Sequence, residues 1–279
     1  MIKRQGPLEI LTRRPAGHAH AVPLLFVHGA YTAAWCWDEH FLPFFADAGY
    51  TACALSLSGH GGSPGREYLD LISLDDYVRD VLEAMDGFDT PPVLIGHSMG
   101  GMVVQKCLEV RQVPAAVLMA SVPPQGLWAS AVGLVMRKPD VMAELNALLA
   151  GGGTSLDALR DALFAQPVSM ERLQQMAARI QPESARVIWD MTLFNLPQPA
   201  RMHRPPMLLL GAECDPIIPP ALTEMTSRAL GVLPHVFPGM GHGMMLEAEW
   251  RKVAQRVLDW LDETLAGSVT DEPDCQTGN

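Results

Sequence analysis

A glycine-flanked serine at the end of an apolar run is the feature that most constrains the fold of this chain. The segment Gly96-His97-Ser98-Met99-Gly100 follows the apolar run 92–95 and precedes an apolar helical pattern. Its spacing matches G-x-S-x-G, a sharp strand-to-helix turn that exposes a serine hydroxyl. Because the turn strains the serine backbone and brings strand and helix together, it requires glycines on both sides. The motif therefore predicts a nucleophile, Ser98, after a buried strand.

A serine nucleophile needs a base and a group that orients this base, and both have candidates downstream. Asp215 lies in a proline-punctuated loop after the apolar run 207–211, which predicts a short buried strand. His242 lies in a glycine-flanked loop after a second predicted strand, 235–237. The order serine, acid, histidine is typical of chains with this turn. We interpret His242 as general base and then acid, and Asp215 as the group that holds the imidazole in the correct tautomer.

Each of these assignments has an alternative. Ser98 could be an ordinary helix N-cap, since serine is favoured there. Asp190, in a helical pattern, and Glu213, two residues before Asp215, compete for the role of the acid, and His242 competes with eight other histidines. A metal site is not expected, because no histidine pair has i,i+4 helical spacing and no C-x-x-C pattern occurs.

Apolar runs and helical patterns alternate along most of the chain. Nearly continuous apolar runs are typical of parallel strands covered on both faces, and they occur at 22–27, 51–55, 93–95 and 116–120. Between them lie helical patterns, one of which begins with Ser73 and Asp76 placed as a capping box. This alternation predicts an α/β fold with a mostly parallel central sheet and helices on both faces.

The alternation stops in the middle of the chain and returns near residue 205. Residues 123–204 show only helical periodicities, which predicts a helical cap over the site. We therefore expect a core from 1–122 and 205–267, which ends in an amphipathic helix. The polar tail 268–279 is expected to be disordered.

Five motifs in order resemble the α/β-hydrolase superfamily. They are Val27-His28-Gly29-Ala30, Ser58-Gly59-His60-Gly61-Gly62-Ser63, the serine turn, the Asp215 loop and the His242 loop. The first motif, together with Trp35-Cys36-Trp37, is similar to the esterase and hydroxynitrile-lyase branch. The chain departs from the pattern at Ser56, where many members carry an acidic residue that braces a loop.

The resemblance implies an oxyanion hole formed by the backbone N–H groups of Ala30 and Met99. Met99 opens a helix, so the helix dipole supports the same assignment. His28, Gly29 and His97 are expected to shape the surrounding loops. Two apolar residues of the predicted cap, Trp128 and Leu134, are expected to line the substrate pocket.

Composition restricts the partners. The formal net charge of −11 argues against nucleic acid and anionic membrane surfaces. The first residues lack the apolar region of a secretory signal, no run approaches the roughly 20 apolar residues of a membrane span, and the five cysteines have no disulfide-like spacing. We therefore expect a cytoplasmic enzyme with a small-molecule partner, while the oligomeric state is not determined by the sequence.

These features together predict a serine hydrolase. We expect it to cleave a small, largely apolar carboxylic ester, thioester or lactone through an acyl-enzyme, with no cofactor and no metal. Alternatives are a C–C bond hydrolase, a hydroxynitrile-type lyase that would use the cap lysine Lys138, and a noncatalytic receptor. A haloalkane dehalogenase or epoxide hydrolase is disfavoured, since both need a carboxylate where this chain has Ser98.

Overall fold

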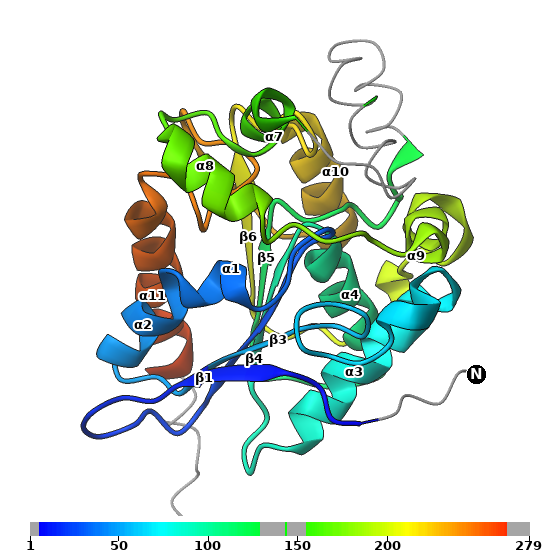
Figure 1. Ribbon diagram of the computed structural model, residues 1–279. Coiled ribbons are helices and arrows are strands. Elements are labelled where there is room, and N and C mark those ends of the chain that lie inside the picture. The colour runs from blue at the N-terminus through cyan, green and yellow to red at the C-terminus, as the bar shows by residue number, and fades with distance from the viewer. Residues whose placement is uncertain (1–5, 129–142, 144–154, 267–279) are drawn as a thin grey trace, which may run out of the picture.

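A single seven-stranded sheet organises the molecule (Figure 1). The computed structural model describes residues 6–128, 143 and 155–266. The strand order is β1-β3-β2-β4-β5-β6-β7, and every neighbouring pair is parallel except β1 and β3. The strands are β1 (Ile10–Arg13), β2 (Leu24–Val27), β3 (Ala52–Leu55), β4 (Val93–His97), β5 (Ala116–Met119), β6 (Met207–Ala212) and β7 (Pro234–Phe237). The predicted fold class is therefore confirmed.

Alternate residues of each buried strand supply two separate cores, one on each face of the sheet. In β2, Leu24 and Phe26 belong to one core, whereas Leu25 and Val27 belong to the other. Both faces are covered, which explains why the parallel strands are almost uniformly apolar. The antiparallel edge strand β1 is short and largely exposed, and the apolar pattern did not predict it.

Helices cover both faces of the sheet (Figure 1). The first core includes residues of α1 (Trp35–Asp38), α2 (Phe41–Asp47) and α11 (Trp250–Ala266). The second includes residues of α3 (Leu74–Asp86), α4 (Met99–Cys107) and α10 (Pro220–Leu230). The capping box predicted at the start of α3 is confirmed, because Ser73 and Asp76 exchange both of its hydrogen bonds. A short 3₁₀ helix, η1 (Arg66–Leu71), precedes α3.

The described part of residues 123–204 is helical. It contains α7 (Leu156–Leu163), α8 (Met170–Ala177), α9 (Ala185–Trp189), the π-helical turn η2 (Asp190–Phe194) and the 3₁₀ turn η3 (Pro199–Arg201). Ser155, Ser169 and Ser184 cap the first three of these helices through their side chains. Leu134 and Lys138 lie outside the described residues. The tail 268–279 and all of 129–154 except residue 143 lie outside them as well. The proposed division into core and cap stays a prediction.

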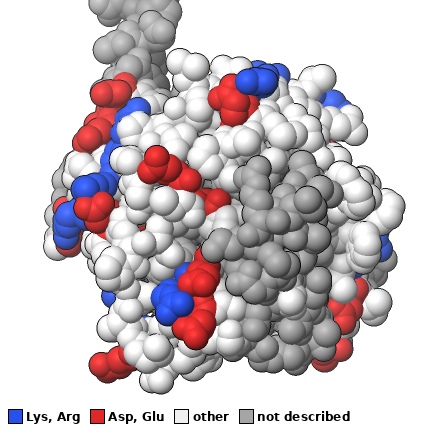
Figure 2. Space-filling model, turned by 90° about the horizontal axis from the view of Figure 1, so that it is seen from above, with Lys and Arg blue, Asp and Glu red and all other residues white. Residues whose placement is uncertain are grey.

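The face that carries α7 and α8 is only sparsely charged. Seen from above, its described acidic and basic side chains lie in scattered, mostly mixed groups with uncharged surface between them (Figure 2). No extended basic surface is therefore visible on the described part of this face.

Among the residues that the structure describes, no helix combines the length and apolar character that a membrane crossing requires.

Candidate active site

Ser98 occupies a strained turn between β4 and α4. Its φ of 54° and ψ of −118° lie outside the regions that ordinary residues favour. A Cβ on Gly96 would overlap the carbonyl of Gly100, and one on Gly100 would overlap the carbonyl oxygen of Val27 in β2. The backbone N–H of Ser98 donates to the carbonyl of Met119 in β5 at 3.0 Å. The glycines of the motif are therefore required because strand and helix pack in direct contact.

The side chain of Ser98 does not cap α4. It makes no capping hydrogen bond, and its Oγ lies 3.0 Å from Nε2 of His242 instead. Nδ1 of His242 lies 2.7 Å from Oδ2 of Asp215. These partners are consistent with a neutral imidazole that donates from Nδ1 to the carboxylate and accepts at Nε2 from the serine hydroxyl. We call this the Ser98–His242–Asp215 relay; its members are only 8%, 4% and 3% exposed.

The sheet brings the three relay residues together. Ser98 follows β4, Asp215 follows β6 and His242 follows β7, so all three lie beyond the carboxyl ends of parallel strands. Asp215 is held by its second oxygen, Oδ1, which accepts backbone hydrogen bonds from Ile217 and Ile218 at 2.8 Å each. The other candidate acids lie elsewhere: Asp190 accepts from the backbone of Leu74, and Glu213 accepts from Gly239.

Two further histidines hold the surrounding loops. His97 donates from Nε2 to the carbonyl of His242 at 2.9 Å, and burial together with nearby His242 lowers the pKa of His97 well below its usual value. Nδ1 of His28 donates to the carbonyl of Gly29 at 2.8 Å, while its Nε2 accepts from the backbone of Leu57 at 3.0 Å. Burial, assisted by nearby His60, lowers the pKa of His28 to about 3. His28 and His97 are therefore neutral and act through hydrogen bonds.

The loop after β2 lies directly against the nucleophile. A Cβ on Gly29 would lie 2.9 Å from Nδ1 of His97 and 3.1 Å from the Cβ of Ser98. The Gly29 carbonyl accepts from Nδ1 of His28 at 2.8 Å and from the hydroxyl of Thr32 at 3.0 Å. Because a peptide unit is planar and trans, fixing this carbonyl also fixes the direction of the next N–H, that of Ala30.

Met99 supplies the other candidate N–H. It is the first residue of α4, so its N–H has no carbonyl partner within the helix and carries the positive end of the helix dipole. Met99 directly follows Ser98 in the chain. Ala30 directly follows Gly29, which packs against Ser98. Their role as an oxyanion hole stays a prediction.

The departure at Ser56 is balanced by a residue that sequence reasoning missed. The Ser56 hydroxyl donates to Oε2 of Glu9 at 2.5 Å and accepts from the backbone of Ala34 at 3.1 Å. Oε1 of Glu9 would meet a Cβ placed on Gly62. The carboxylate of Glu9 thus lies beside the turn that contains Gly62, although position 56 is a serine. Only the antiparallel pairing of β1 with β3 brings it there.

A second missed residue, Glu183, anchors the helical segment to the core. It is 1% exposed, accepts from the Tyr77 hydroxyl at 2.6 Å, and lies 3.2 Å from Nε2 of His60, without hydrogen-bond alignment. Burial alone would raise the pKa of Glu183, but His60 and the hydrogen bonds from Tyr77 and the Ser184 backbone lower it below its usual value. Burial and Glu183 together raise the pKa of Tyr77 well above its usual value. The anchor is therefore a buried carboxylate held by core side chains.

The two predicted pocket residues lie at the edge of the described residues or outside them. Trp128 lies at the edge of the described residues and is 60% exposed, and Leu134 lies outside them. Their role in substrate binding stays a prediction. Within the described ranges, no three histidine, cysteine or acidic side chains converge as a metal site would need.

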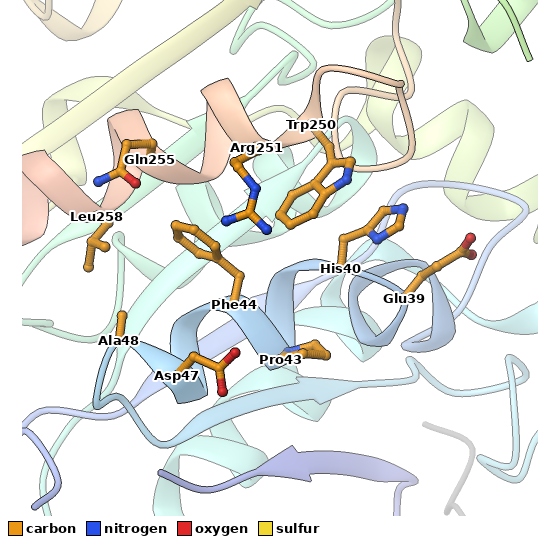
Figure 3. A pocket seen from close by; sticks show the side chains of 10 residues that line it. All are labelled: Glu39, His40, Pro43, Phe44, Asp47, Ala48, Trp250, Arg251, Gln255 and Leu258. Atoms are coloured by element: carbon orange, nitrogen blue, oxygen red, sulfur yellow. The ribbon is translucent and has the colours of Figure 1, made fainter. Parts of the chain in front are cut away.

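A hollow of about 370 Å³ between α2 and α11 lies apart from the relay (Figure 3). Trp250 stacks on His40 with ring centroids 4.6 Å apart, and the guanidinium of Arg251 lies over the rings of both Phe44 and Trp250. These stacked groups pack α11 against α2. None of the relay residues lines this hollow, so it belongs to the packing of two helices and not to the serine site.

A strained serine turn, a buried relay and a parallel sheet covered on both faces together define a hydrolase-type α/β protein. The chain belongs to the alpha/beta hydrolase family, whose model matches residues 24–256. The esterase from Exiguobacterium antarcticum has a similar structure, with a TM-score of 0.75 at 18% identity over 91% of this chain and 95% of that one. At this identity the likeness shows the fold alone.

Curated relatives match over a shorter segment. The probable esterase PIR7A of Oryza sativa subsp. indica is 36% identical over 104 residues, which is 36% of this chain and 39% of that protein. Salicylic acid-binding protein 2 of Nicotiana tabacum is 32% identical over 110 residues, 38% of this chain and 42% of that protein. The chain thus spans about two-fifths of the length of these relatives.

Proposed function

We propose that this protein is a serine esterase that cleaves a small, largely apolar carboxylic ester through an acyl-enzyme. A thioester or lactone would react at the same acyl carbon. The observation that carries the proposal is the relay itself, with 3.0 Å from the serine hydroxyl to the imidazole and 2.7 Å from the imidazole to the carboxylate. The names of several relatives, including PIR7A, describe esterases and support the same reaction class.

The proposed reaction begins when Ser98 attacks the carbonyl carbon while Nε2 of His242 takes the hydroxyl proton. The carbonyl oxygen becomes an oxyanion, which the N–H groups of Ala30 and Met99 stabilise. His242 then gives its proton to the leaving alcohol, and the acyl group remains on Ser98. A water molecule, activated by the same imidazole, attacks the acyl-enzyme and releases the acid.

The surroundings of Asp215 suit this sequence of proton transfers. His242 becomes an imidazolium when it accepts the serine proton, and the adjacent carboxylate stabilises that charge. The two backbone N–H groups on Oδ1 keep the carboxylate in place during both steps. Apart from substrate and water, the proposed cycle uses groups of the chain alone. The expected cytoplasmic setting, the small-molecule partner and the C–C hydrolase and lyase alternatives stay predictions.

Replacing the nucleophile tests the proposal. We expect Ser98→Ala to lower kcat/KM for a short-chain p-nitrophenyl ester by about 10³-fold or more, because the alanine cannot form the acyl-enzyme. Steady-state kinetics and labelling by a fluorophosphonate probe measure the loss. Ser227→Ala is the matched control, because Ser227 in α10 is also 8% exposed and lies outside the relay. Retained turnover in folded Ser98→Ala would refute the proposal.

A further inference from the structure

One fully buried carboxylate beside the relay has no part in the proposed reaction. Glu247 follows the His242 loop and is 1% exposed. Its Oε1 accepts from the backbone N–H groups of Ala165 at 2.7 Å and Gly241 at 2.8 Å, and its Oε2 accepts from that of Gln166 at 3.3 Å. Burial raises the pKa of Glu247, and the backbone hydrogen bonds oppose this rise because they stabilise the ionised carboxylate. Glu247 therefore joins separate segments through its hydrogen bonds.

The segments that meet at Glu247 have different origins. Gly241 directly precedes His242, whereas Ala165 and Gln166 follow α7 in the helical segment between β5 and β6. On the other side of His242, the N–H of Gly243 donates to the carbonyl of Leu163 at 2.7 Å. Both residues that flank the base are thus tied to this segment. Gly241 is linked to residues 165–166 through Glu247, and Gly243 is bonded directly to Leu163 at the end of α7.

The backbone is tightly packed around Gly241. A Cβ on Gly241 would lie 2.7 Å from the backbone nitrogen of Ala165, 2.7 Å from Oε1 of Glu247 and 2.8 Å from the carbonyl of Leu163. Contacts this short would force the surrounding backbone to move. The position of the His242 loop is consequently set by residues 163–166 as well as by the sheet.

We propose that Glu247 is a positioning residue for His242. By binding the His242 loop to residues 165–166, Glu247 holds the imidazole within reach of Ser98. The inference rests on the proposed role of His242 as the base. Small displacements of a catalytic group reduce the rate strongly, and about 1 Å is enough for a loss near 10²-fold. Glu247 acts on the rate through the position of the base and touches no reacting atom.

The test compares Glu247→Gln with Glu249→Gln. In the first change the amide oxygen can accept from Ala165 and Gly241, but the N–H₂ then faces the backbone N–H of Gln166, which loses its acceptor. The second change alters a carboxylate that is 45% exposed and contacts Lys252 and the Gln166 side chain. We expect Glu247→Gln to lower kcat about 10- to 100-fold with KM unchanged within about twofold. Fluorophosphonate labelling of Ser98 should slow in parallel, while Glu249→Gln stays within about twofold of the wild type in both measurements.

A merely structural role predicts a different pattern. The melting temperature would fall, but kcat per folded, titrated active site would match the wild type, and this result would overturn the inference. Equal kinetics for the two variants would overturn it as well. Glu247→Asp, which keeps the charge on a shorter side chain, provides the same comparison if Glu247→Gln does not fold. A failure of the proposed function is distinguished by Ser98→Ala, which would then retain turnover.

Discussion

The acid of the relay is held by backbone groups that prescribe which of its atoms faces the base. Oδ1 of Asp215 accepts from Ile217 and Ile218, so only Oδ2 remains for His242. An asparagine in this place would keep its carbonyl oxygen on the two N–H groups. Its N–H₂ would then face Nδ1 of His242 and force the proton onto Nε2, where it blocks transfer from Ser98.

We therefore expect Asp215→Asn to fold normally and to lose about 10³- to 10⁴-fold in kcat. Steady-state ester kinetics measure the loss, and thermal unfolding verifies the fold. Asp190→Asn is the control, since Asp190 is also buried but accepts from Leu74 and pairs with Arg186. If Asp190→Asn loses as much kcat as Asp215→Asn, the assignment of the acid is wrong.

The close packing of helix α4 against strand β2 constrains the serine turn. A Cβ on Gly100 would overlap the carbonyl oxygens of both Val27 and His28. These are backbone atoms at the end of the central strand β2 and of the residue that follows it, and they cannot rotate away as a flexible side chain would. The helix therefore begins where it does only because this position has no side chain.

The approach predicts a strong effect of Gly100→Ala on stability. We expect the free energy of unfolding to fall by about 3 kcal/mol or more, because strand and helix must separate to admit a methyl group. Urea unfolding followed by circular dichroism measures it. At Gly17 a Cβ would meet nothing within 4 Å, so Gly17→Ala is expected to change the stability by less than about 0.5 kcal/mol. Similar values for both variants would contradict the packing argument.

Burial lowers the pKa of two imidazoles, those of His28 and His97, and this makes the stability of the molecule depend on pH. The pKa of His28 falls from 6.5 to about 3 and that of His97 falls well below 6.5, in both cases mainly through burial. In the unfolded chain both side chains regain ordinary pKa values. Below pH 6.5 the unfolded state therefore binds more protons than the folded state, and stability decreases as the pH falls.

Each imidazole should contribute a slope of about 1.4 kcal/mol per pH unit between pH 6 and pH 4. We expect His28→Gln to reduce the dependence by about this amount, whereas His18→Gln, which changes an exposed residue, leaves it unchanged. Urea unfolding at pH 4.5 and 5.5 measures the slopes. An unaltered slope in His28→Gln would show that His28 is not held neutral.

Local chemistry made much of this protein predictable from its sequence. The apolar runs predicted β2 to β5 and the strand before Asp215, because strands covered on both faces need apolar residues throughout. The glycine spacing predicted the serine turn, because backbone sterics exclude other residues there. The order of Ser98, Asp215 and His242 followed from the same motif.

Only the tertiary structure decided how distant segments meet. Ser98 and His242 are 144 positions apart, and their 3.0 Å separation depends on the order β4-β5-β6-β7 within the sheet. Glu9, Glu183 and Glu247 had no sequence signal, since a buried carboxylate resembles any surface glutamate until its partners are known. Periodicity and turn sterics act over a few residues, whereas the pairing of strands and the closure of buried hydrogen bonds depend on the whole folded chain.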